Sequence, residues 1–497
     1  MKHVLAIDQG TTGSTCLVLS ADGLITGRAY REITQHFPRP GWVEHDATEI
    51  LDRTLDAARE AIRASGVTPD AIGITNQRET VVVWEKSSGR PLAPAIVWQD
   101  RRTAERCRTL ADRAEWISSL TGLPLDPYFS ATKLEVLLAL PEVKARVSAG
   151  DALAGTIDCW MTWKLTGGKV HATDPTNASR TMLFDIGERR WSEELCSLFG
   201  VPMEILPEVR PSSGDFGATV PWCFGTEIPI RGIAGDQQAA LFGQGCVNAG
   251  EAKNTYGTGA FLLLNTGDVR PEPGDGLLST VACDAGGEYA YALEGSIFIA
   301  GAAVQWLRDG LGIIDAASDA EPLARSLESN DGVYFVPALA GLGAPHWEPE
   351  ARGMITGLTR GTSRAHLVRA ALEAMACGTA DVFDAMKERS GVPFTRLRVD
   401  GGAAVNDWLM QFQSDMLRVP VERPEMVETT ALGAAALAGL AAGVWSSAAD
   451  FMAVKRYTVF EPAMDDVAAS AVRSGWDRSV NAALYWARNP RIREDHS

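Results

Sequence analysis

Cysteines that could act together are missing from this sequence. Its 497 residues include eight cysteines, which are scattered and form no Cys-x-x-Cys pair. This spacing excludes the usual zinc site and the disulfide framework of small secreted proteins. The first apolar stretch is interrupted by Asp8 and alternates as a strand does, so we expect no signal peptide. A reducing, cytoplasmic location follows from both observations.

Positive charge is also in short supply. The net charge is −17 at pH 7, which argues against nucleic acid or an anionic membrane surface as the main partner. A nucleotide remains possible, because Mg²⁺ and backbone N–H groups hold phosphates without a basic surface. The hydrophobic content of 46% is that of a globular protein, and 497 residues exceed one core, so we expect at least two domains.

Long apolar runs are limited to one segment. Residues 429–449 carry no charge and place Gly439 and Gly443 at the spacing found in membrane helix pairs. The segment consists mostly of Ala and Gly, with few large aliphatic side chains. We therefore expect a close-packed buried helix here and no membrane insertion.

The common nucleotide-binding loops are absent too. The sequence has neither a Walker A motif nor a complete Gly-x-Gly-x-x-Gly. Asp215-Phe216-Gly217 spells a protein-kinase motif, and Ser130-Ala131-Thr132-Lys133 spells one of penicillin-binding enzymes. Both lack their partner motifs, so we interpret the first as a chance match in a loop and the second as chance or a helix N-cap.

One pattern occurs twice. Residues 4–19 and 253–264 each read as an apolar strand, a tight turn of Gly and Thr, and a second apolar strand. Glycine permits a sharp reversal, and such a turn exposes backbone N–H groups and hydroxyls that suit phosphate oxygens. Two such hairpins, one in each half, predict a duplicated fold whose two loops hold one polyphosphate.

Around these hairpins, strands alternate with helices, which predicts an α/β protein with mixed sheets. Residues 246–253 interrupt the periodicity and divide the chain into domains 1–248 and 249–497. The sequence-based elements are listed here: strands at 24–32, 71–75, 80–85, 228–234, 289–295 and 397–400, and helices at 48–64, 101–149, 237–243, 302–311, 364–389 and 405–416.

Three glycine-containing turns follow apolar strands, and each has an aspartate at the strand end. The aspartates are Asp8, Asp236 and Asp400. Ligands bind at the ends of strands in α/β folds. Carboxylates placed there can hold hydrated Mg²⁺ or accept a proton from a substrate.

The chain resembles the FGGY carbohydrate kinase family and, within it, the members that phosphorylate glycerol. The likeness covers nearly the whole chain and rests on these segments: Asp8 to Thr12, Gly73 to Thr80, Ile96 to Gln99, Asp126 to Ser130, Gly235 to Gly243, Asn254 to Gly259 and Asp400 to Gly402.

The resemblance implies two ribonuclease-H-like domains, as in actin, hexokinase and the Hsp70 ATPase, with a cleft between them. It implies ATP-dependent phosphorylation of glycerol to sn-glycerol 3-phosphate, with ADP as product, in glycerol catabolism, and a homodimer or homotetramer. ATP and Mg²⁺ are the implied cofactors, and glycerol and ATP the implied partners.

The resemblance also assigns roles by position. Asp236 is the implied general base, and Asp8 and Asp236 hold Mg²⁺ through water. The implied glycerol residues are Arg78, Glu79, Trp98, Tyr128, Asp236, Gln237 and Phe261. The implied nucleotide residues are Thr11, Thr12, Gly13, Thr258, Gly301, Gln305, Gly402 and Asn406.

Alternatives remain at this point. Arg78 and Glu79 are also consistent with a surface ion pair, and Trp98 with plain core. A kinase for another polyol or sugar, such as erythritol or xylulose, and a nucleotide-gated binding protein without turnover are the competing functions. The chain also departs from the family, with Gly13 and Thr15 where a serine and a basic residue are common.

Overall fold

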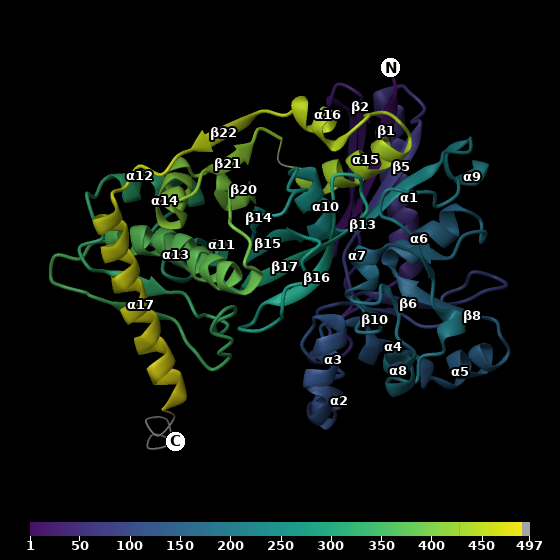
Figure 1. Cartoon of the computed structure of the whole chain (residues 1–497), viewed down its shortest axis with the longest axis horizontal. Coiled ribbons are helices and arrows are strands. Elements are labelled where there is room, and N and C mark those ends of the chain that lie inside the picture. The colour runs from purple at the N-terminus through teal and green to yellow at the C-terminus, as the bar shows by residue number, and fades with distance from the viewer. Residues whose placement is uncertain (427, 490–497) are drawn as a thin grey trace. The chain divides into compact units, whose positions relative to one another are not determined.

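The computed structural model describes residues 1–426 and 428–489, which form two compact units (Figure 1). The first unit contains residues 1–248 together with 279–292 and 428–455. The second contains 249–278, 293–426 and 456–489. The sequence-based boundary at residues 248 and 249 puts both 279–292 and 428–455 in the second domain, whereas in the structure both segments pack with the first unit.

A mixed sheet forms the centre of the first unit, with the strand order β13-β5-β1-β2-β3. Strands β1 and β5 are parallel and fully apolar in their middle, as expected for strands covered on both faces. Strand β2 pairs antiparallel with β1 on one side and with β3 on the other. The strands of this sheet are β1 (His3–Gln9), β2 (Gly13–Ser20), β3 (Ile25–Glu32), β5 (Ala71–Asn76) and β13 (Ile230–Gly235).

The second unit repeats this topology. Within its sheet, the run β17-β15-β14-β20-β21 has the same order and the same parallel β14–β20 and β20–β21 pairs as the run β3-β2-β1-β5-β13. The predicted duplication is therefore visible strand by strand. The strands of this sheet are β14 (Glu251–Tyr256), β15 (Ala260–Gly267), β16 (Leu278–Cys283), β17 (Tyr289–Ile297), β20 (Arg396–Gly401), β21 (Val421–Pro424) and β22 (Tyr457–Phe460). Of these, residues 279–292 of β16 and β17 are grouped with the first unit.

Helix α15 (Thr429–Ala441) contacts β1, β5, β13 and α10 of the first unit (Figure 1). The contact is backbone against backbone. A Cβ atom at Gly73 would lie 2.0 Å from the carbonyl oxygen of Ala434, and one at Gly433 would lie 1.8 Å from that of Ala239. The Ala and Gly content of this segment thus serves close packing. Among the described residues, no helix combines the length and apolarity needed to cross a membrane.

Several predicted helices differ in detail from the observed ones. The helical region at 101–149 is wrong as one element, because Gly122, Pro124, Pro127 and Pro141 divide it into short helices. The helix predicted at 302–311 changes at residue 306 from an α-helix to a π-helical turn. The helix predicted at 405–416 begins only at Asp407, because Asn406 caps it.

The remaining elements surround the two sheets. In the first unit they are β4 (Glu44–His45), α1 (Ala47–Ser65), β6 (Val81–Glu85), β7 (Ala95–Ile96), α2 (Ala104–Thr109), α3 (Ala114–Thr121), α4 (Ser130–Leu138), α5 (Pro141–Ser148), β8 (Ala152–Thr156), α6 (Ile157–Leu165), β9 (Ala172–Thr173), α7 (Pro175–Ala178), β10 (Phe184–Asp185), β11 (Arg190–Trp191), α8 (Glu193–Leu198), β12 (Glu208–Val209), α9 (Pro221–Phe224), α10 (Asp236–Gly243) and α16 (Ala448–Ala453). In the second they are α11 (Gly301–Gln305), α12 (Ala320–Arg325), β18 (Tyr334–Val336), β19 (Met354–Thr356), α13 (Arg364–Ser390), α14 (Asp407–Leu417) and α17 (Asp466–Arg488).

Candidate active site

Arg78 and Glu79 form the turn that follows β5. Their side chains are 3% and 1% exposed, so they are not the surface ion pair considered from the sequence. Glu79 has a φ of 62°, a left-handed conformation that is uncommon for a residue other than glycine. Strained backbone of this kind is concentrated at binding and catalytic sites.

Asp236 lies beside Arg78. The Arg78 Nε atom is 3.0 Å from Asp236 Oδ1, and the backbone N–H of Gln237 donates to the same oxygen at 2.7 Å. Helix α10 begins with Asp236, and Gly235 occupies the N-cap position, so the aspartate does not cap this helix. A Cβ atom at Gly235 would lie 2.7 Å from Arg78 Cγ, so glycine there lets the arginine reach the carboxylate.

Glu79 is held from a second direction by Arg180. The Arg180 Nε atom donates to Glu79 Oε1 at 2.7 Å, and the Arg180 side chain is fully buried. The hydroxyl of Ser130 donates to the carbonyl oxygen of Glu79 at 3.0 Å. Side chain and backbone of Glu79 are therefore both fixed by residues from distant parts of the sequence.

Two aromatic rings stand next to each other in this unit. Trp98 and Tyr128 meet edge to face, with ring centroids 5.5 Å apart and an interplanar angle of 90°. The indole N–H of Trp98 donates to Thr11 Oγ1 at 2.8 Å. Trp98 is partly exposed, so the core role considered from the sequence does not apply.

The turn that contains Thr11, Thr12 and Gly13 joins β1 to β2. The Gly10 N–H donates to the Gly13 carbonyl at 2.9 Å and closes this turn. A Cβ atom at Gly13 would lie 2.4 Å from the Arg31 carbonyl oxygen, which gives a steric reason for glycine in place of the family's serine. Thr15 lies in β2 and pairs there with Tyr30 of β3. This position of the strand therefore carries a hydroxyl in place of the family's basic side chain.

Asp8 is electrostatically linked to Asp236. Burial raises the pKa of Asp8 to about 7, and the negative charge of Asp236 acts in the same direction. Two carboxylates that repel each other favour a cation between them, and hard oxygen ligands suit Mg²⁺, which keeps several of its waters. In the described part of the chain, no group of three or more His, Cys, Asp or Glu residues is placed to hold a metal directly.

The second unit contains a pocket of about 560 Å³. All five nucleotide residues that the sequence assigned to this half line it: Thr258, Gly301, Gln305, Gly402 and Asn406. Glycine is required beside it, because a Cβ atom at Gly301 would lie 2.5 Å from the Gly257 carbonyl oxygen. Asn406 accepts the N–H of Leu409 at 2.9 Å and so starts α14 at the pocket wall.

The other two candidates lie at separate places. Gln237 is the second residue of α10, directly after Asp236. Phe261 belongs to β15 in the second unit and pairs there with Thr255. The aspartate of the third predicted turn, Asp400, is buried on β20 and pairs with the same Thr255 in the neighbouring strand.

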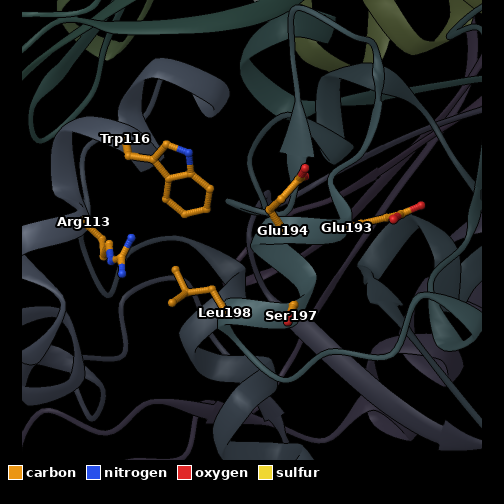
Figure 2. Close-up of a pocket in the computed structure, with 6 residues that line it drawn as sticks. All are labelled: Arg113, Trp116, Glu193, Glu194, Ser197 and Leu198. Carbon is orange, nitrogen blue, oxygen red and sulfur yellow. The ribbon is translucent and has the colours of Figure 1, made fainter.

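A separate hollow of the first unit has a volume of about 460 Å³ (Figure 2). Arg113 and Trp116 line it from one side, and Glu193, Glu194, Ser197 and Leu198 of α8 line it from the other. It contains none of the residues predicted from the sequence, and we assign it no role.

Comparison with known proteins decides the family. Residues 3–243 match the N-terminal domain of the FGGY family of carbohydrate kinases, and residues 252–442 match the C-terminal domain. The chain belongs to the FGGY family of carbohydrate kinases. The predicted family and the two-domain α/β fold are thereby confirmed.

Individual relatives are similar over almost the full length. The chain is 54% identical to glycerol kinase from Dechloromonas aromatica, covering 98% of both chains. It is 51% identical to glycerol kinase 2 from Thermotoga maritima, covering 98% of this chain and 100% of the relative. The structure matches that of Plasmodium falciparum glycerol kinase with ADP at a TM-score of 0.93 and 38% identity, covering 97% of this chain and 98% of that one.

Sequence reasoning did not single out two buried cations of the site. Arg180 lies 101 residues from Glu79 in the chain. No short sequence motif or periodicity near either residue predicts their contact. Lys133 was seen only as part of a chance motif, although its ammonium group donates to the carbonyl oxygen of Tyr128 at 2.6 Å. The signal that could have found Lys133 is a lysine within an otherwise apolar or small-residue helical turn, five residues after Tyr128.

Proposed function

We propose that the protein transfers the terminal phosphate of ATP to a terminal hydroxyl of glycerol, giving sn-glycerol 3-phosphate and ADP. The observation that carries the proposal is the contact between the buried Arg78 and the partly exposed Asp236, next to Glu79. A triol leaves water when it binds, and each hydroxyl then needs a partner. Arg78 donates, Glu79 accepts, and Asp236 with Gln237 does both. Trp98 and Tyr128 offer apolar faces for the carbon chain, and Phe261 is assigned the same task.

Asp236 is the general base in this proposal. Both of its contacts use Oδ1, so we assign Oδ2 to the proton of the attacking hydroxyl. Arg78 fixes the orientation of the Asp236 carboxylate, and a general base must be positioned within hydrogen-bond reach of the proton it accepts. The remaining task in phosphoryl transfer is to orient the reactants and to stabilise charge.

ATP binds in this proposal through the pocket of the second unit, with Thr258, Gly301, Gln305, Gly402 and Asn406. Thr11, Thr12 and Gly13 of the first unit receive the β- and γ-phosphates. Asp8 and Asp236 hold Mg²⁺ through water, and the ion supplies positive charge to the phosphate oxygens. A cation there also offsets the repulsion that raises the pKa of Asp8.

We further propose that the enzyme works in the cytoplasm as a homodimer or homotetramer. All eight cysteines are buried free thiols, in keeping with a reducing compartment. Light scattering on the purified protein measures the mass of the assembly, and a monomer at working concentration would contradict this part.

Turnover measures the proposed function directly. ADP release is followed with ATP alone and with glycerol, erythritol, xylulose or gluconate, and the phosphorylated product is identified by NMR. We expect glycerol to have the highest kcat/KM. A higher value for another polyol makes the protein a kinase for that compound, and tight ATP binding without any acceptor-dependent ADP makes it a nucleotide-gated binding protein.

A further inference from the structure

The first turn of α4 carries a serine and a lysine that are both fully buried, Ser130 and Lys133. In penicillin-binding enzymes this spacing lets the two side chains act together. Here the two side chains bind different groups. Ser130 Oγ donates to the carbonyl oxygen of Glu79, while Lys133 Nζ donates to carbonyl oxygens of residues 127–129, just before α4. The pair is therefore no nucleophile with its base.

Lys133 makes three hydrogen bonds to three successive residues. Its Nζ atom lies 2.5 Å from the carbonyl oxygen of Pro127, 2.6 Å from that of Tyr128 and 3.1 Å from that of Phe129. An ammonium group has three N–H donors and no acceptor. Each of the three donors therefore has one backbone carbonyl oxygen as its acceptor. The three contacts fix the backbone of the loop immediately before α4.

Burying this ammonium group is unfavourable in isolation. Burial lowers the pKa of Lys133 to about 7, while the nearby carboxylates of Glu79, Asp100 and Asp126 act in the opposite direction. A loop can be closed with neutral groups at lower desolvation cost. A buried lysine therefore destabilises the fold more than a neutral group would. We infer that the conformation of the loop has a function that offsets this cost.

The middle residue of this loop is Tyr128. Its ring meets Trp98 edge to face at 5.5 Å and Phe129 at 5.0 Å. The Arg180 guanidinium, which binds Glu79, lies 5.8 Å from the centre of the Tyr128 ring. A shift of the Tyr128 backbone would therefore move the ring that the proposed function places against glycerol.

We propose that Lys133 is a positioning residue for glycerol: it fixes the backbone of 127–129 so that Tyr128 closes one side of the glycerol site, while Ser130 from the same helical turn fixes Glu79 on another. This inference rests on the proposed function, because it assigns Lys133 a role only if Tyr128 contacts the substrate.

A double-mutant cycle on the full chain tests the coupling between Lys133 and Tyr128. The variants are Lys133→Met, Tyr128→Ala and the double variant, with glycerol and ATP affinities measured by calorimetry. We expect Lys133→Met to weaken glycerol binding about tenfold in the wild-type background and by less than about threefold in the Tyr128→Ala background. ATP affinity should change by less than about twofold in every variant.

Two further variants make the result decisive. Lys164→Met is the matched control, because Lys164 also donates to a backbone carbonyl of the first unit, that of Gly89, at a place outside the site. It should leave glycerol affinity unchanged. Lys133→Gln keeps two of the three donors, so it should fold where Lys133→Met does not, and it should lie between wild type and Lys133→Met in glycerol affinity.

The outcomes separate the two proposals. Wild-type protein that binds no glycerol contradicts the proposed function. Wild-type protein that binds glycerol, with equal losses from Lys133→Met in both backgrounds, contradicts the positioning role alone. Equal losses for glycerol and ATP, or a loss of the same size in Lys164→Met, reduce Lys133 to a general contribution to stability and overturn the inference.

Discussion

The indole Nε1 of Trp98 donates a hydrogen bond to the hydroxyl of Thr11 at 2.8 Å. Trp98 is assigned to glycerol and Thr11 to the phosphates of ATP, so one bond joins the two parts of the proposed site. Both residues belong to the first unit, where Trp98 follows β7 and Thr11 lies in the turn between β1 and β2.

Replacing Trp98 by Phe should affect both substrates. Phenylalanine keeps an aromatic ring at this position but has no N–H group, so the hydrogen bond to Thr11 is lost. The loss should cost roughly 0.5–1.5 kcal/mol of stabilisation of the site. We expect the KM values for glycerol and ATP each to rise by about two- to tenfold. Steady-state kinetics with either substrate varied measures this, and a rise for glycerol alone would show that the bond does not support the phosphate turn.

Asp236→Asn should separate binding from chemistry. Asparagine still accepts hydrogen bonds from Arg78 and from the Gln237 N–H, but it cannot take the hydroxyl proton. We expect kcat to fall by about 10²–10⁴, while glycerol affinity stays within about an order of magnitude. Kinetics and a glycerol titration on one preparation decide the point. A near-native kcat would remove Asp236 from the mechanism.

Glu79→Gln should weaken glycerol selectively. The change removes the charged acceptor and leaves Arg180 without its carboxylate, and a charged hydrogen bond contributes roughly 1.5–3 kcal/mol. Glycerol affinity should fall by about 10- to 150-fold, with little change for ATP. Glu85→Gln is a matched control, since Glu85 is also buried in the first unit and pairs with Arg146 at 2.8 Å. A similar loss in the control would make the effect one of folding.

Asp8 should make stability depend on pH. Burial raises its pKa in the folded protein to about 7, from the ordinary aspartate value of 3.8. Between these two values the folded chain keeps a proton that the unfolded chain has lost. The contribution of Asp8 to the free energy of unfolding therefore falls as pH rises from about 4 to 7, by ~1.4 kcal/mol for each pH unit. Asp8→Asn lacks this dependence.

Without Mg²⁺, the Asp8→Asn variant should therefore match wild type near pH 4 and unfold at higher denaturant concentration above pH 7. In a separate assay with Mg²⁺ and both substrates, its turnover should be lower than that of wild type. Urea unfolding across this pH range gives the comparison. Parallel pH profiles for the two proteins would show that Asp8 titrates normally.

Gly402, which lines the proposed nucleotide pocket, and its neighbour Gly401 should respond differently to substitution. Gly401 has a φ of 87°, and a Cβ atom there would lie 2.2 Å from the Tyr256 carbonyl oxygen, so Gly401→Ala should lower the melting temperature. Gly402 lines the pocket, and a Cβ atom there meets no described heavy atom within 4 Å. Gly402→Leu should therefore fold normally and raise the KM for ATP about tenfold or more. Equal melting temperatures, or an unchanged KM for Gly402→Leu, would contradict this assignment of the pocket.

Much of the architecture was predictable because it is encoded locally. The two hairpins and the strands that follow them show alternating or continuous apolar patterns, and the glycines mark their turns. The helical region at 101–149 was less predictable, since its prolines and Gly122 end helices that a periodicity reading joins together. Asp8, Asp236 and Asp400 were proposed because they follow such strands, whereas Arg78 and Glu79 were proposed from the family resemblance.

The supporting residues of the site were not predictable from one sequence. Arg180 reaches Glu79, and Lys133 reaches the carbonyl oxygens of 127–129, through contacts that depend on the tertiary fold. A buried cation has no periodic signature, and its partners here are a distant carboxylate in one case and backbone atoms in the other. The family resemblance proposed the groups assigned to the ligands, but it did not point to the residues that hold those groups.

The position of α15 in the chain has a consequence for synthesis. The first unit begins at residue 1, yet the helix whose backbone packs against Gly73 and against the 239 carbonyl comes from residues 429–441. A ribosome that has released residues 1–248 has not yet made this helix. During translation, the surface of the first unit's sheet that α15 covers therefore stays uncovered until more than four hundred residues have been made. Chaperones that bind apolar nascent chains can bind this surface throughout that time.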